Sequence, residues 1–161
     1  MNEKIKSTQE YLDSNYQQAA QSLATIAFGK FKDVRAKGRE FSMADWEESL
    51  TRTNTNLQKQ LNFPPDSSRL NYLALEQMML LKDQEPDMST PGAAFFNDQY
   101  LLALKNDIIE SALASGDDFH DVLGQKLRQL SVRGVNLDNK LINDLKSQWA
   151  NEYYDKLSNA N

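Results

Sequence analysis

Apolar residues recur every three or four positions along most of this 161-residue chain, and this spacing is typical of amphipathic helices. The first segment shows it well, with a stripe that runs through Leu12, Tyr16, Leu23, Phe31 and Val34. No stretch alternates apolar and polar residues over enough positions to indicate a sheet. Six glycines and four prolines are also few for a turn-rich all-β protein. The sequence therefore predicts an all-α fold.

We expect one helical domain over residues 1–161, built as a bundle of five or six helices. Residues 1–38 form a long N-terminal helix that ends near Gly38. At about 30 residues this helix exceeds the usual length in a compact domain, so it either packs on the bundle or projects from it. Residues 42–161 form the helical bundle.

Capping residues indicate where the helices of that bundle begin. Ser42 is a natural N-cap, and Asp45 follows three residues later as the acid of a capping box. This second helix has a thin apolar stripe, which predicts a helix that is mostly exposed or is covered by something outside the chain. Residues 70–81 are apolar on nearly every face, and with residues 95–113 they are expected to form the middle of the core.

The remaining helix boundaries follow from the same signals. Thr90 and Pro91 read as the N-cap and first residue of the fourth helix, which continues to about residue 114. Asp117 or Asp118 caps a short fifth helix that ends near residue 130. The last helix runs from about residue 137 to residue 157.

Composition and motifs exclude most enzyme classes that can be recognised from a sequence. Cys is absent, so thiolate catalysis and zinc-thiolate sites are excluded, and His120 is the sole histidine. Nucleotide-binding glycine loops and the serine-nucleophile motif do not occur. The acidic residues are best explained as helix caps and solvated surface, and any role for His120 stays open. We therefore predict a protein that is not an enzyme and that uses no cofactor or metal.

The start of the chain lacks an apolar secretion signal, and the longest apolar stretch is too short to span a bilayer. We expect a cytoplasmic or virion-associated protein without a membrane contact. The net charge of −5 makes general nucleic-acid binding unfavourable.

One charged segment departs from this acidic character. Five cations fall within ten residues, where Asp33 is the one acid, and they could contact an anion or an acidic partner: Lys30, Lys32, Arg35, Lys37 and Arg39. We refer to them as the basic segment. The competing interpretation is a solvated helix end, where cations also suit the helix dipole.

The function that best fits these observations is a protein-interaction or assembly protein that acts through helical surfaces. Its role would be that of an inhibitor, an adaptor or a structural subunit of a phage-like particle. We expect it to form a homo-oligomer or to be a subunit of a larger assembly. The residues predicted for its protein interface are Trp46, Leu50, Leu57, Tyr153 and Tyr154. The alternative is a nucleic-acid-associated regulator that uses the basic segment.

Overall fold

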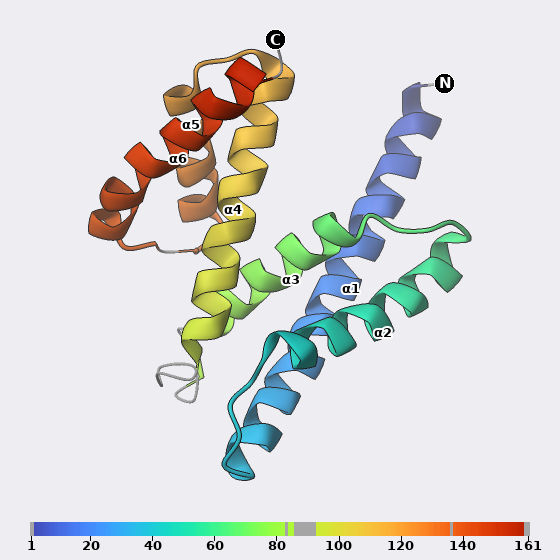
Figure 1. The fold of residues 1–161 in the computed structure, drawn as a ribbon. Coiled ribbons are helices and arrows are strands. Elements are labelled where there is room, and N and C mark those ends of the chain that lie inside the picture. The colour runs from blue at the N-terminus through green and yellow to red at the C-terminus, as the bar shows by residue number, and fades with distance from the viewer. Residues whose placement is uncertain (1, 83, 86–92, 136, 160–161) are drawn as a thin grey trace. The chain divides into compact units, whose positions relative to one another are not determined.

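The protein folds into six helices in a computed structural model that describes residues 2–82, 84–85, 93–135 and 137–159, with side chains from Thr8 onward (Figure 1). The helices are α1 (Asn2–Ala36), α2 (Met43–Leu61), α3 (Ser67–Lys82), α4 (Ala94–Ser115), α5 (Phe119–Val132) and α6 (Asn139–Asn159). No strand occurs among the described residues. The predicted all-α fold with a long N-terminal helix is confirmed.

The chain divides into two compact units, Met1–Tyr100 and Leu101–Asn161, and the boundary falls within α4. The prediction of one domain over residues 1–161 stays a prediction. Local signals fixed the helix ends: Ser42 and Asp118 cap α2 and α5 as expected. Asp66 caps α3, since its side chain accepts hydrogen bonds from two backbone N–H groups of the first turn. The Thr90–Pro91 prediction lies outside the described residues.

In the first unit, α1 packs against both α2 and α3, and α2 returns beside α1 in the opposite direction (Figure 1). The inner stripe of α1 is buried from Tyr16 to Val34, so this part of the helix does not project. From Arg69 to Leu81 no residue of α3 is exposed, as expected for a helix that is apolar on nearly every face.

The apolar stripe of α2 is covered by the chain itself, which corrects the expectation of an outside cover, whereas eleven of its nineteen residues are exposed, in agreement with the alternative of a mostly exposed helix. Besides its few large side chains, α2 buries Ser49 and Thr53. Each hydroxyl donates to the backbone carbonyl four residues earlier at 3.0 Å, so neither is left without a partner. Small alanines are also buried on α1, Ala20 and Ala24 among them. Both helices therefore bury small side chains as well as large ones.

In the first unit, an aromatic cluster packs around Phe96 of α4. The ring of Phe96 lies 5.7 Å from that of Phe31, 4.9 Å from Phe41 and 6.1 Å from Trp46, measured between centroids. Edge-to-face and tilted pairs at these distances add about 0.5–1.5 kcal/mol each to the burial of the rings. Phe96 therefore joins α1, α2 and the segment between them.

The second unit is held by both apolar and ionic contacts. Phe119 stacks on Tyr153 with centroids 5.4 Å apart. Lys105 pairs with Glu152 of α6 at 2.9 Å, and Asp107 pairs with Lys126 of α5 at 2.9 Å. These two ion pairs connect α4 to each of the other helices in the unit.

The buried hydroxyl of Tyr16 gives a test of the first unit. It accepts a hydrogen bond of 2.8 Å from the backbone N–H of Asp66, which fixes the start of α3 on α1. Tyr16→Phe removes this acceptor, and we expect a loss of about 1–2 kcal/mol in the free energy of unfolding, measured with urea. The matched change Tyr11→Phe, at a residue that is 57 % exposed, should leave stability unaltered. Equal effects at both tyrosines would contradict this role.

Candidate functional site

The basic segment begins in the last turns of α1 and continues through the link to α2. Gly38 adopts a left-handed conformation with φ of 75°, which L residues rarely take. Its N–H donates to the carbonyl of Arg35 at 3.0 Å, and the N–H of Arg39 donates to that of Val34 at 2.8 Å. This pair of bonds is the Schellman motif, and it ends α1 where Gly38 predicted.

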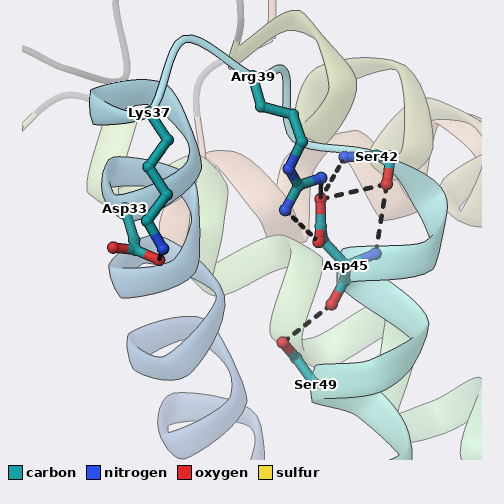
Figure 2. A network of polar contacts seen from close by, with 6 residues as sticks. All are labelled: Asp33, Lys37, Arg39, Ser42, Asp45 and Ser49. Carbon is teal, nitrogen blue, oxygen red and sulfur yellow. Dashed lines mark hydrogen bonds and ion pairs between the residues drawn. The ribbon is translucent and has the colours of Figure 1, made fainter.

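Arg39 makes a two-pronged ion pair across this link (Figure 2). Its Nη1 lies 2.9 Å from Oδ2 of Asp45, and its Nη2 lies 3.0 Å from Oδ1. Oδ2 also accepts from the backbone N–H of Ser42 at 2.9 Å and from its hydroxyl at 3.1 Å. The predicted capping box is therefore present, and a guanidinium reinforces it.

This network explains how a buried carboxylate is tolerated. The Asp45 side chain is 7 % exposed, and an unpaired charge at that depth would be costly. Hydrogen bonds from Arg39, and then from the backbone and hydroxyl of Ser42, lower the pKa of Asp45 from 3.8 to about 2. The same hydrogen bonds, which Arg39 donates to Asp45, raise the pKa of Arg39.

The other cations of the basic segment are also engaged by neighbours. Lys37 pairs with Asp33 at 3.2 Å, one turn earlier on α1. Lys32 lies 4.6 Å from the centre of the Phe28 ring, and Arg35 lies 6.0 Å from that of Phe31. Lys30 is half-buried.

The basic segment therefore presents less charge than its composition indicates. Residues 30–48 hold five Lys or Arg and five Asp or Glu, so their net charge is zero. Lys37 and Arg39 are committed to carboxylates within the chain. The nucleic-acid hypothesis stays a prediction, and the geometry adds nothing in its favour.

The five residues predicted for the protein interface differ in how deeply the structure buries them. Trp46, Leu57 and Tyr153 are buried at 2 %, 2 % and 6 % exposure. They belong to the chain's own core, and the prediction of a free contact surface is corrected at these three positions. Leu50 is half-buried, whereas Tyr154 is 47 % exposed beside Tyr153. The interface prediction stays with these two residues.

In the described part of the chain, the carboxylates are not assembled into a metal centre. His120 lies in an acidic hollow of about 340 Å³ in the second unit, with Asp117, Asp118 and Asp121 among its lining residues. Asp118 is used as a helix cap, through bonds to the N–H groups of His120 and Asp121. Among the described residues, no three acidic or imidazole side chains are arranged to hold a metal ion.

A feature that our sequence reasoning missed is a groove of about 470 Å³ between α1 and α2. Its lining contains no charged residue, and it consists of Gln18, Ala19, Ser22, Ile26, Thr53, Asn56, Leu57 and Gln60. The available signal was a run of sixteen residues without a charge, from Ser14 to Gly29. We refer to this feature as the uncharged groove.

Comparison with known proteins gives no relative: no family model, no curated protein and no solved structure matches this chain. None of the helices in the described ranges has both the length and the apolar character needed to cross a bilayer.

The pairing of Asp45 predicts a specific dependence of stability on pH. Since its pKa in the folded chain is below the unfolded value of about 3.9, its contribution is fully present above about pH 5. That contribution is lost as the pH falls from about 4 to about 2. We expect Asp45→Asn to lower the free energy of unfolding by about 1–2 kcal/mol at neutral pH, a value reduced by solvent screening of the half-exposed Arg39.

Urea unfolding of both proteins between neutral pH and about pH 3 measures this difference, which should shrink as the solution becomes more acidic. The control is Asp33→Asn, which breaks an exposed pair and should change stability by less than about 0.5 kcal/mol at neutral pH. A difference between Asp45→Asn and the natural chain that stays constant with pH would contradict the assignment.

Proposed function

We propose that this chain is a non-enzymatic interaction protein that binds another protein through a helical surface. The observation that carries the proposal is the N-terminal part of α1. From Thr8 to Asn15 the helix continues without a single buried side chain, and Tyr11 is 57 % exposed. A helical surface is therefore available outside the packed part of the first unit.

The energetics of this segment favour a partner. Its turns are held by their own backbone hydrogen bonds, and isolated helices shorter than about 12–15 residues are marginal in water. The ion pair of Asp13 with Arg69 ties the inner end of the segment to α3. Beyond that point, packing against a partner would supply the apolar burial that the chain itself does not provide.

The chemistry of the segment indicates the kind of contact. Exposed tyrosine is enriched at protein interfaces, where a rigid aromatic ring buries a large area and its hydroxyl bonds to a polar rim. Leu12, which is half-buried, adjoins Tyr11 on this segment. An inhibitor, an adaptor and a subunit of an assembly would all use such a surface.

Quantitative affinity capture from a lysate of the source cells tests the proposal. Tyr11→Asp should reduce the specifically captured partner at least tenfold, because a hot-spot aromatic residue is worth about 2 kcal/mol or more. Gln9→Asp introduces the same charge at an exposed position of the same segment and should retain capture.

Both variants change exposed residues, so their melting temperatures should match that of the natural chain. Equal capture by all three proteins, or no specific capture by the natural chain, would contradict the proposal.

A further inference from the structure

The packed part of α1 ends at Tyr16, beside the start of α3. Tyr16 is buried at 4 % exposure, whereas none of the side chains from Thr8 to Asn15 is buried. The hydroxyl of Tyr16 accepts from the backbone N–H of Asp66, the residue that caps α3. Within one turn, α1 therefore changes from a packed helix to a helix without buried side chains. We refer to residues 8–15 as the N-terminal segment.

Arg69, in the first turn of α3, contacts both sides of this boundary. Its guanidinium carbon lies 4.2 Å from the centre of the Tyr16 ring, on the packed side. Its Nη2 is paired with Oδ1 of Asp13, which lies three residues earlier and on the same face of α1. The nearby carboxylate of Asp66 is engaged as a helix cap by the backbone N–H groups of Ser68 and Arg69. One side chain thus joins the last packed turn of α1 to the N-terminal segment.

We propose that Arg69 is a clamp that controls the fraction of chains in which the N-terminal segment is helical, and that ionic strength adjusts this clamp. Helical turns near a chain end that bury no side chain open at a small cost in free energy. A single added contact therefore shifts the balance between the helical and the frayed form. The buried ring of Tyr16 holds the guanidinium in place, and Asp13 closes the clamp by pairing with it.

The exposure of the pair makes the clamp sensitive to salt. The side chain of Arg69 is 39 % exposed and that of Asp13 is 52 % exposed. Ion pairs between such groups are weak, and counter-ions screen them. Tyr16 is fixed by its own burial, so high salt opens the pair with Asp13 and leaves the guanidinium stacked on the ring. The N-terminal segment is then less often helical.

The importance of the clamp for binding rests on the proposed function, because the segment that it orders carries Tyr11. A partner that binds the helical form binds more weakly in proportion to the fraction of chains in which the segment is frayed. The order of the segment is nevertheless a property of the free chain. It is measured without a partner, so the two proposals can fail separately.

Hydrogen–deuterium exchange of the free full-length chain tests the clamp, read from a peptide that covers the N-terminal segment. In the natural chain, we expect exchange to be about two- to fivefold faster in high salt than in low salt, after correction for the unfolded chain. Asp13→Asn should exchange at the faster rate in both solutions, because it has no ion pair left to screen. Asp33→Asn is the matched control, since it breaks another exposed pair of α1 and should retain the natural rates and their response to salt.

Arg69→Gln removes the stacking as well as the ion pair, and exchange of the N-terminal segment should become about tenfold faster. Adding Asp13→Asn to this variant should have little further effect, because the two residues act through one contact. Peptides from residues 70–81 should exchange at the natural rate in both single variants, which distinguishes a local opening from a loss of the fold.

Equal exchange of the N-terminal segment in the natural chain and in Asp13→Asn would overturn the inference. A response to salt that persists in Asp13→Asn would overturn it as well. The proposed function would survive either result if capture still depended on Tyr11. Conversely, the expected exchange pattern without Tyr11-dependent capture would support the clamp and remove the proposed function.

Discussion

The ion pair between Arg39 and Asp45 determines where α2 begins and how it returns along α1. A single carboxylate oxygen of Asp45 accepts from the Arg39 guanidinium and from two groups of Ser42. The Schellman motif fixes the backbone of Arg39 on one side, and the capping box fixes Asp45 on the other. The link between the two helices is therefore held at both ends.

The helices α1 and α2 bury small side chains as well as large apolar ones. Serine and threonine at buried helix positions usually leave a polar group to be satisfied. In α2, Ser49 and Thr53 satisfy theirs by bonding to the preceding turn of the same helix. They are therefore buried as compact side chains with their hydroxyl groups satisfied. A helix can thus be firmly covered even though its sequence shows only a few large apolar residues.

The sequence predicted where the helices begin and end better than it predicted which of their side chains are buried. Helix ends are local events: Ser42, Gly38 and Asp118 act on backbone groups within a few residues, and all three are found at the predicted ends. The burial of Trp46 and Tyr153 depends on which helices lie opposite, and that information is not local.

The surroundings of the candidate site could not be predicted from the sequence for a related reason. The basic segment was evaluated against the one acid among its ten residues, whereas Arg39 has its partner six residues along the chain, in the first turn of α2. The uncharged groove depends on two helices that meet in space. Its only trace in the sequence is an absence of charge, which ordinary motif searches do not register.

The distribution of charge along α1 separates structural roles from recognition. The charges that flank its middle are used within the chain, where Asp13 pairs with Arg69, Asp33 with Lys37, and Arg39 reaches Asp45. Because residues 30–48 sum to zero, this end of the helix generates little field at a distance. A partner that approaches the middle of α1 therefore encounters shape and hydrogen-bonding groups in place of a net charge. Recognition of that kind is short-ranged and insensitive to salt, which suits a protein surface far better than a polyphosphate backbone.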